Sequence, residues 1–230
     1  MLFNNWKGYY NNILNDFNFD IKKDIESAEL LDSLILENNR ASLDDLKDFI
    51  KGNKAAIFGA GPSLNGSVDI FEKNRYILKI TADGATTAFI ENNLVPDLVV
   101  TDLDGKMSDQ LKANKKGSIV IVHAHGDNID KIKEYVPKFQ GKVLGTTQTD
   151  PSLFENIYNF GGFTDGDRCV FIADHFKAKQ IDLIGFDYDR LGKYSFYERK
   201  DIEKKFKKLR WCKYLIDELI KENNSIKYYV

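Results

Sequence analysis

The fold class of this chain can be predicted from one stretch, Leu98-Val99-Val100-Thr101-Asp102-Leu103-Asp104-Gly105. Its first half, Leu98–Thr101, is a short apolar run without the polar alternation of a half-exposed strand. Such runs are typical of parallel strands that helices cover on both faces. We therefore predict an α/β fold with a mostly parallel sheet and helices on both faces. Five further runs predict the remaining strands: Ala55–Phe58, Tyr76–Thr81, Ile119–His123, Lys142–Leu144 and Ile181–Ile184.

Helical patterns flank these strands at both ends of the chain. Trp6, Tyr10 and Ile13 lie on one helical stripe, and Ser42 begins a capped helix that runs through Ile50. From residue 202 onward, apolar residues recur at helical spacing against a Lys/Glu face, which we interpret as a solvated face. We predict an N-terminal helical extension over residues 1–52. Residues 53–230 then form an α/β catalytic domain that ends in an amphipathic helix.

Charge, apolar patterning and cysteine content argue against several classes of protein. The net charge of -2 disfavours a general nucleic-acid-binding surface, which needs a basic excess. No apolar stretch approaches membrane-spanning length, so we expect no membrane partner. Cys169 and Cys212 are too few and too far apart for a zinc site or a disulfide framework, and they fit a reducing cytoplasm. The oligomeric state stays open, with a homodimer as the candidate assembly.

Acidic residues follow two of the predicted strands, and the carboxyl ends of parallel strands are where such sheets build ligand sites. Asp102 and Asp104 come directly after Leu98–Thr101, and Asp83 follows the preceding strand. Alternate residues of an extended segment point the same way, so Asp102 and Asp104 are expected to converge on one hard cation, with Asp83 as a third acid. Magnesium prefers a few carboxylates together with phosphate oxygens and water. The alternative is helix capping or loop solvation by these aspartates; we favour the metal site.

A glycine-rich turn, residues 59–64, follows the first strand. Its glycines permit close approach of the backbone to phosphate, and its proline suits the first turn of a helix whose N-terminus favours an anion. Leu64 stands where a dinucleotide fingerprint has its third glycine, which argues against a nicotinamide cofactor. The alternative is a plain strand-to-helix turn. The residues of this turn that we expect to bind nucleotide are Gly59, Gly61, Pro62 and Ser63.

Two further clusters follow later strands. His123 and His125 could bind zinc, but no cysteine or third histidine accompanies them, so hydrogen bonding to phosphate ranks above metal binding. The loop before the predicted helix Cys169–Phe176 carries the second cluster. Thr164 or Asp165 would cap that helix. Alternatively, Asp165 and Asp167 complete a metal shell and Arg168 pairs with a phosphate.

The sequence contains no Gly-x-Ser-x-Gly elbow, no Walker A loop and no kinase catalytic-loop signature. Covalent hydrolase chemistry is therefore disfavoured. An acidic, glycine-rich site without a nucleophile favours transfer chemistry, in which positioning and metal electrostatics do most of the work.

Five motifs follow one another between Lys54 and Asp189, at Phe58–Leu64, Ala82–Thr86, Pro96–Gly105, His123–Asn128 and Gly162–Arg168. In this order they resemble the archaeal 6-hydroxymethyl-7,8-dihydropterin diphosphokinases of the MptE type. The fold of that family is similar to the catalytic domain of thiamine diphosphokinase. The resemblance implies transfer of a diphosphate from ATP to the hydroxymethyl group of a reduced pterin, with release of AMP. The implied pathway is tetrahydromethanopterin or folate-type pterin biosynthesis.

The same resemblance implies roles for individual residues. The substrate's own hydroxyl would attack the β-phosphorus of ATP, while Mg²⁺ bridges the phosphates. One carboxylate among Asp165, Asp167 and Asp187 would face the pterin. The implied metal ligands are Asp83, Asp102, Asp104 and Asp165. The implied phosphate and nucleotide contacts are His123, His125, Arg168, Thr164, the Asp83-Gly84 pair and the turn Gly59–Ser63.

Three other functions remain open at this stage. Thiamine diphosphokinase would use the same acids on a different acceptor. A nucleotide-sugar glycosyltransferase is a second alternative, because certain bacterial sialyltransferases share the Gly-x-Gly-Pro-Ser-Leu opening. The third is a catalytically silent nucleotide-binding module whose helical ends bind partners.

Overall fold

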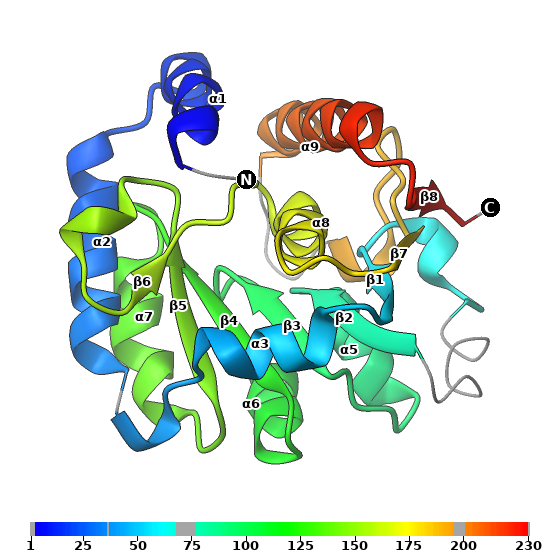
Figure 1. The fold of residues 1–230 in the computed structure, drawn as a ribbon, viewed down its shortest axis with the longest axis horizontal. Coiled ribbons are helices and arrows are strands. Elements are labelled where there is room, and N and C mark those ends of the chain that lie inside the picture. Colours follow the sequence, from blue (N-terminus) through cyan, green and yellow to red (C-terminus); the bar gives the residue numbers. More distant parts are fainter. Residues whose placement is uncertain (1–2, 36, 68–76, 196–200, 230) are drawn as a thin grey trace.

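A single parallel sheet of eight strands forms the centre of the molecule (Figure 1). The computed structural model describes residues 3–35, 37–67, 77–195 and 201–229. The strand order is β6-β5-β4-β3-β2-β1-β7-β8, and every neighbouring pair is parallel. The strands are β1 (Lys54–Phe58), β2 (Ile77–Ala82), β3 (Leu98–Thr101), β4 (Ile119–Ala124), β5 (Val143–Thr147), β6 (Ile157–Tyr158), β7 (Gln180–Ile184) and β8 (Ile226–Tyr228).

The predicted α/β architecture is confirmed, and the strands differ from the prediction mainly at their ends. β3 matches the predicted strand residue for residue. β5 continues beyond its predicted end at Leu144, because Thr146 and Thr147 are polar yet buried within the sheet. β6 and β8 are too short, at two and three residues, to show a periodic pattern in the sequence. Tyr76, the predicted first residue of β2, lies outside the described residues.

Helices cover both faces of the sheet, as the apolar strands predict. Ser42 begins α3 as expected, since its Oγ accepts the Asp45 N–H at 3.0 Å and the Asp45 carboxylate accepts the Ser42 N–H at 2.7 Å. One face carries α1 (Phe3–Phe17), α3 (Leu43–Ile50), α8 (Asp165–His175) and α9 (Ile202–Glu222). The other carries α2 (Ile21–Leu34), α5 (Ala85–Glu91), α6 (Met107–Lys115) and α7 (Ile129–Tyr135).

β3 shows why the strand sequences look continuously apolar. Leu98 and Val100 point into the hydrophobic cluster that includes α8, while Val99 points into the cluster on the opposite face. All three side chains are fully buried. Each such burial contributes roughly 1.5–3 kcal/mol, so an apolar residue is favoured at every position of the strand.

The helices at the two ends of the chain belong to this same core. Trp6 and Tyr10 of α1 are buried, and the Trp6 ring meets the ring of Phe171 in α8 edge-on at a centroid distance of 6.4 Å. Leu215 and Ile216 of α9 join the same cluster. Residues far apart in sequence therefore build one wall over the sheet (Figure 1).

The strand order reverses at β1. From β1 to β6 each new strand is added on one side, whereas β7 and β8 lie on the other side of β1. In open α/β sheets, ligands bind beyond the carboxyl ends of the strands at such a reversal.

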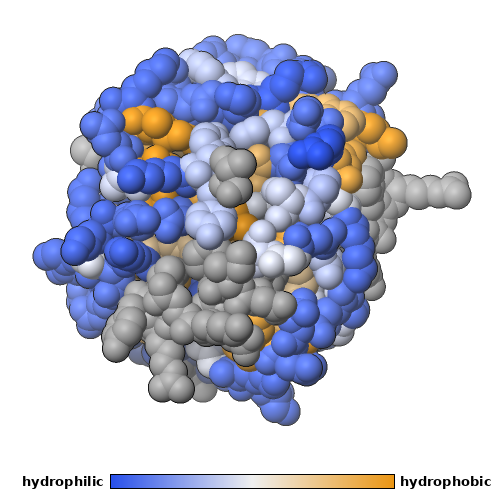
Figure 2. Space-filling model, turned by 90° about the vertical axis from the view of Figure 1, so that its right-hand side faces the viewer, coloured by the Kyte–Doolittle hydropathy of each residue, from blue (hydrophilic) through white to orange (hydrophobic). Residues whose placement is uncertain are grey.

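The outer surface offers few apolar areas on the face shown in Figure 2, where orange patches are small and separated by hydrophilic residues. Within the described residues, no helix combines the length and the apolar character needed to cross a bilayer.

Candidate active site

A cavity of about 800 Å³ opens beyond the carboxyl ends of the strands. The segments that follow β1, β2, β3, β4 and β7 line it, together with the first turn of α8 and the N-terminal half of α9. It therefore lies at the reversal of strand order. Its volume falls within the roughly 300–1,000 Å³ of typical small-molecule sites.

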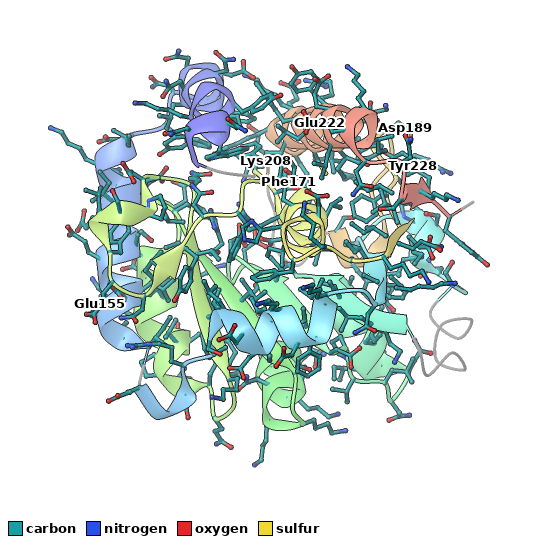
Figure 3. All side chains as sticks on the ribbon, in the orientation of Figure 1. Glu155, Phe171, Asp189, Lys208, Glu222 and Tyr228 are labelled. Carbon is teal, nitrogen blue, oxygen red and sulfur yellow. The ribbon has the colours of Figure 1, made fainter. Side chains whose placement is uncertain are left out.

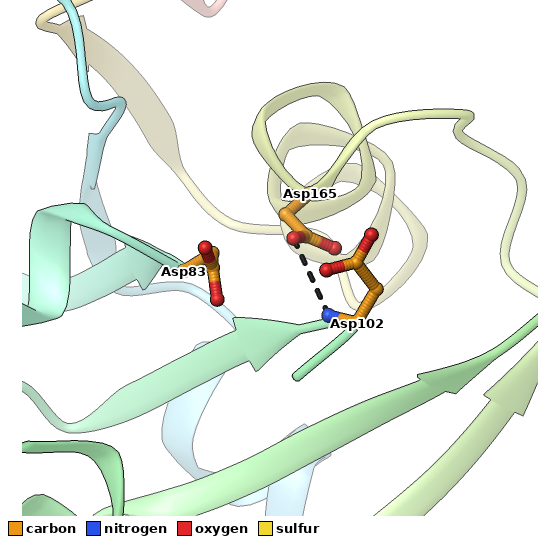
Figure 4. A group of neighbouring side chains, drawn as sticks. All are labelled: Asp83, Asp102 and Asp165. Carbon is orange, nitrogen blue, oxygen red and sulfur yellow. Dashed lines mark hydrogen bonds between the residues drawn. The ribbon is translucent and has the colours of Figure 1, made fainter. Parts of the chain in front are cut away.

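Three carboxylates converge on this cavity: those of Asp83, Asp102 and Asp165. One oxygen of each lies within 4.8 Å of the other two (Figure 4). Asp83 follows β2, Asp102 follows β3, and Asp165 is the first residue of α8. Asp104 lines the same cavity but is not among the three converging carboxylates.

The backbone of Leu103 explains why Asp104 is displaced from the cluster. The expectation that Asp102 and Asp104 converge assumed an extended segment, in which alternate side chains share a side. Leu103 instead has φ +67°, in the left-handed region, and its N–H donates to Thr101 Oγ1 at 2.8 Å. The chain turns there, so the alternation does not hold and that geometric expectation is wrong. A buried leucine in this conformation is strained, and strain of this kind collects at functional sites.

Hydrogen bonds orient the carboxylate of Asp83. Its Oδ1 accepts from Thr101 Oγ1 at 2.8 Å, from Gln110 Nε2 at 2.7 Å and from the Gly105 N–H at 3.1 Å. A Cβ on Gly105 would lie 2.7 Å from both Asp83 carboxylate oxygens. Residue 105 is therefore glycine because Asp83 occupies the space that a side chain would need.

Asp165 is a buried carboxylate close to another carboxylate. Its Oδ1 accepts from Arg168 Nη1 at 2.8 Å, and its Oδ2 accepts the Asp102 N–H at 3.4 Å. Burial and the nearby Asp102 carboxylate raise the pKa of Asp165 well above its usual range, and Arg168 opposes that rise. A divalent cation among the three carboxylates would offset this repulsion. The donor set therefore fits a hard cation such as Mg²⁺, which prefers carboxylate oxygens.

His125 contacts the acid cluster directly. Its Nε2 lies 3.2 Å from Asp102 Oδ2, and it lines the main cavity. Asn128 supports this arrangement: its Oδ1 accepts the His125 N–H at 3.0 Å, and its Nδ2 donates to the backbone O of Asp102 at 2.8 Å. The loop after β4 is thereby fixed to the loop after β3.

His123 lies apart from the main cavity. It is buried within β4, and its Nδ1 lies 3.1 Å from Thr146 Oγ1. Because that hydroxyl donates to the backbone O of Val122, the imidazole is the donor to Thr146. Burial and the charge of Arg168 lower the pKa of His123 well below its usual range. A neutral, buried ring is poorly placed to touch phosphate, so the predicted contact of His123 is not supported.

Arg168 and Asp167 also have structural partners. The Arg168 guanidinium is buried against Asp165 and donates to the backbone O of Phe163 at 3.0 Å. It does not line the main cavity, so its predicted phosphate contact is not supported. The buried Asp167 carboxylate accepts the N–H groups of Phe163 at 2.6 Å and Thr164 at 2.7 Å. Asp167 therefore caps the start of α8 instead of facing a ligand.

Thr164 caps α8, as predicted, and lines the cavity. The helix begins at Asp165, four residues before the predicted start at Cys169. The first turn of the helix is polar, so the apolar pattern in the sequence did not reveal where the helix begins. The consequence is that Asp165 sits on the first turn of a rigid helix and not in a mobile loop.

The glycine-rich turn forms part of the cavity wall, but its N–H groups point elsewhere. Those of Gly59 and Gly61 donate to the backbone O atoms of Ile184 and Gly185 at 2.8 and 2.9 Å. The Ser63 N–H and hydroxyl both donate to Asp187 Oδ2, at 2.8 and 2.6 Å. An internal carboxylate thus occupies the place expected for a phosphate, and the predicted N–H contacts are not available.

The described part of this turn contains one 3-10 turn, Pro62–Leu64, instead of the start of a longer helix. Gly59 and Gly61 line the cavity; Pro62 and Ser63 do not. A Cβ on Gly59 would lie 2.7 Å from the backbone O of Gly185. The glycines therefore serve the close contact between the loops after β1 and β7. Gly84 also lines the cavity, and a Cβ there would collide with the backbone O of Tyr194.

Sequence reasoning missed the cations of α9. Lys204, Lys205 and Lys208 line the cavity and are only partly exposed, so they are not the solvated face that the composition suggested. Their spacing of three to four residues was the available signal. Only the packing of α9 over the cavity identifies which lysines of this lysine-rich helix face inward.

Comparison with known proteins places these features in a family. A family profile described as 6-hydroxymethylpterin diphosphokinase MptE-like matches residues 33–192. A protein of Methanocaldococcus jannaschii named 6-hydroxymethyl-7,8-dihydropterin pyrophosphokinase is 47% identical over 228 residues, or 93% of this chain and 94% of its own. Proteins of the same name from Methanothermobacter thermautotrophicus and Pyrococcus furiosus are 42% and 41% identical, covering 86% and 99% of this chain and 83% and 97% of theirs. The family resemblance of the five motifs is thereby confirmed.

Among solved structures, a MAf glycosyltransferase from Magnetospirillum magneticum AMB-1 aligns with 77% of this chain and 29% of its own, at 12% identity and a TM-score of 0.41.

Proposed function

We propose that this chain, which belongs to the MptE-like 6-hydroxymethylpterin diphosphokinase family, transfers a diphosphate from ATP to 6-hydroxymethyl-7,8-dihydropterin. The products are the pterin diphosphate and AMP, in tetrahydromethanopterin or folate-type pterin biosynthesis. The observation that carries this proposal is the convergence of Asp83, Asp102 and Asp165 in a cavity of about 800 Å³.

The reaction needs positioning more than covalent chemistry. The hydroxymethyl oxygen forms a bond to the β-phosphorus of ATP. The bond from that phosphorus to the oxygen bridging the α-phosphorus breaks, and AMP leaves with this oxygen. The hydroxyl proton is released to solvent or to a carboxylate of the site. No side chain of the protein becomes covalently modified.

The acid cluster supplies the ligands for Mg²⁺, and bound Mg²⁺ would neutralise charge on the phosphate oxygens. Asp83 is held for this role by its three hydrogen-bond donors, and Asp165 by Arg168. Asp102 is held by His125: because the Asp127 N–H donates to His125 Nδ1, the ring's N–H is on Nε2 and donates to Asp102. Asp104, at the cavity wall, is suited to accept from water around the cation.

The acceptor is assigned to the part of the cavity beside Asp187. Of the three carboxylates expected to compete for the pterin, Asp167 caps α8 and Asp165 belongs to the metal cluster. Asp187 lines the cavity next to Phe186 and Tyr188, whose rings are tilted by 58° to each other and offer aromatic contacts to a pterin. We therefore assign the amino and ring N–H donors of the pterin to Asp187.

The test is an assay with ATP, Mg²⁺ and each candidate acceptor, followed by detection of AMP. We expect AMP and pterin diphosphate with the dihydropterin, and no AMP with thiamine. AMP formation with thiamine but not with the dihydropterin would show that thiamine is the acceptor. Hydrolysis of a CMP-sugar without consumption of ATP would show that the protein is a glycosyltransferase. A protein that binds nucleotide without turnover of any acceptor would be a binding module.

The variant Asp102→Asn tests the cation site and keeps the buried pair between Asp165 and Arg168. Turnover should be lost while the fold survives, because the Asp102 carboxylate repels that of Asp165 in the cation-free protein. The matched control is Asp130→Asn, an exposed aspartate on α7 outside the cavity, which should leave turnover unchanged. Full magnesium-dependent turnover in Asp102→Asn would show that the cation binds elsewhere.

A further inference from the structure

One face of α9 changes character along the helix. The residues of this face that line the cavity are Asp201, Lys204, Lys205, Lys208, Leu209 and Cys212, at successive intervals of three, one, three, one and three positions. That spacing is a single helical stripe. Beyond it, the same face continues as the buried residues Leu215, Ile216 and Leu219. The stripe is therefore cationic over the cavity and apolar over the core.

The three lysines are held in place by neighbours at the cavity rim. Lys205 Nζ donates to the backbone O of Ser195. Lys208, on the side of α9 toward α8 (Figure 3), places its Nζ 5.8 Å from the centroid of the Phe163 ring. Lys204 Nζ lies 3.8 Å from Asp127 Oδ2, in a pair whose side chains are 42% and 60% exposed. An ammonium group has three N–H donors, so one lysine can contact more than one acceptor.

Lys205 interacts electrostatically with the carboxylates of the acid cluster. Burial lowers the pKa of Lys205, whereas the carboxylates of Asp83, Asp102 and Asp165 oppose that shift. A half-buried lysine is costly unless anions face it. The protein thus places a cation and three carboxylates in the lining of one cavity.

The lysines would reduce electrostatic repulsion between the acid cluster and ATP in the proposed reaction. Three carboxylates can hold Mg²⁺, but they also repel the polyphosphate of ATP. The α9 cations in the same lining would offset that repulsion for phosphates bound beside them. A lysine ammonium is a compact point charge that serves this purpose well.

We propose that Lys205, flanked by Lys204 and Lys208, binds the β- and γ-phosphates of ATP, the diphosphate that is transferred. This inference rests on the proposed function and adds which end of the nucleotide lies under α9. The AMP portion contacts other parts of the cavity. Removing the Lys205 charge therefore weakens diphosphate binding selectively and leaves AMP binding unchanged.

The experiment is calorimetric titration of the full chain, in Mg²⁺, with inorganic diphosphate and separately with AMP. Lys205→Met keeps the length and apolar stem of the side chain while removing its charge. We expect diphosphate affinity to fall about tenfold or more, as for loss of a charged hydrogen bond, and AMP affinity to stay within about twofold. Lys205→Arg, which retains a charge, should recover most of the diphosphate affinity.

Lys213→Met is the matched control. Lys213 lies on the same helix, pairs with Asp217 at 2.5 Å and does not line the cavity, so both affinities should equal those of the wild type. Lys208→Met should lower diphosphate affinity in the same direction and decides the matter if Lys205→Met does not fold. Unchanged diphosphate affinity in a folded Lys205→Met protein, or an equal loss of AMP affinity, would overturn the inference.

The proposed function is judged separately, by AMP formation from ATP and the dihydropterin in the wild-type protein. A wild type that forms no AMP contradicts the reaction, and the two titrations still decide what Lys205 binds. A wild type that forms AMP, combined with a Lys205→Met protein that binds diphosphate normally, contradicts only the role of Lys205.

Discussion

Arg168 Nη1 donates to Asp165 Oδ1 at 2.8 Å, one helical turn apart at the N-terminus of α8. Only 3% of the Arg168 side chain and 11% of the Asp165 side chain are exposed. The pair is therefore shielded from solvent screening. The pair thereby orients the Asp165 carboxylate, which is the member of the acid cluster that comes from a helix and not from the end of a strand.

Arg168→Met should destabilise the protein and weaken its cation site together. Breaking a buried ion pair leaves one charge without compensation and typically costs about 3–5 kcal/mol. We expect a fall of that order in the free energy of unfolding, measured by denaturant titration, and a higher Kd for Mg²⁺. Arg210→Met, at an exposed position of α9, should change neither quantity. An unchanged Mg²⁺ affinity in a folded Arg168→Met protein would show that Asp165 does not need this partner.

Thr101→Val should impair the cation site with a smaller effect on stability. Thr101 Oγ1 donates to Asp83 and accepts the Leu103 N–H, so valine removes both hydrogen bonds without changing the side chain's shape. We expect about 1–3 kcal/mol of lost stability and about 10–100-fold weaker Mg²⁺ binding. Thr81→Val, in the adjacent strand β2, is the control, because it removes a hydrogen bond to Thr86 of α5 and touches no carboxylate. Equal Mg²⁺ affinities in both variants would contradict the orienting role of Thr101.

Gly105→Ala should displace Asp83 and lower activity. The added methyl group would meet both Asp83 carboxylate oxygens at 2.7 Å, so either the carboxylate or the loop must move. Turnover should fall at least about tenfold, because displacements of this size misplace reacting groups. Gly8→Ala is the opposite case: nothing lies within 4 Å of a Cβ in the exposed middle of α1. That variant should gain roughly 0.5–1 kcal/mol of stability and retain full activity.

Mg²⁺ should raise the Tm, and the rise should shrink as the pH falls. Because the pKa of Asp165 is raised in the folded, cation-free protein, the folded state holds this proton more tightly than the unfolded chain does. The contribution of Asp165 to stability therefore declines as the pH rises from the ordinary carboxyl pKa through the raised one. Protons compete with Mg²⁺ for the same oxygens over that interval.

Thermal unfolding with and without Mg²⁺ across a pH series measures this effect. Asp165→Asn should flatten the pH dependence of the Mg²⁺-induced shift, since its side chain does not titrate in that range. A shift in Tm that is independent of pH in the wild type would count against Asp165 as a ligand.

Asp24→Asn should loosen the loop that carries His125. The buried Asp24 carboxylate accepts from Tyr10 Oη at 2.7 Å, from Gln148 Nε2 at 2.8 Å and from the Gly126 N–H at 2.7 Å. An asparagine cannot accept all three, so we expect a loss of about 1.5–3 kcal/mol and a reduced kcat. Asp20→Asn, at the start of the same helix, should be nearly neutral because both residues cap helices well. A Tm and kcat equal to those of the wild type in Asp24→Asn would contradict this tether.

The acid cluster was only partly predictable from the sequence. Strand ends and acidic residues pointed to Asp83 and Asp102, because both follow apolar runs of a parallel sheet. Asp165 entered through a family resemblance and a loop pattern, and no local rule places it beside Asp102. The expected convergence of Asp102 with Asp104 failed because a single residue, Leu103, leaves the extended conformation.

The α/β class, the strands near the site and the family could all be predicted from the amino-acid sequence. Each of these depends on local periodicity or on short motifs, which neighbouring residues specify. The folded structure was needed to show that Asp165 completes the acid cluster, that His123 and Arg168 lie outside the main cavity, and that the lysines of α9 face into it. Those outcomes depend on contacts between segments far apart in the chain, and a helical pattern alone does not reveal which neighbour its polar face will meet.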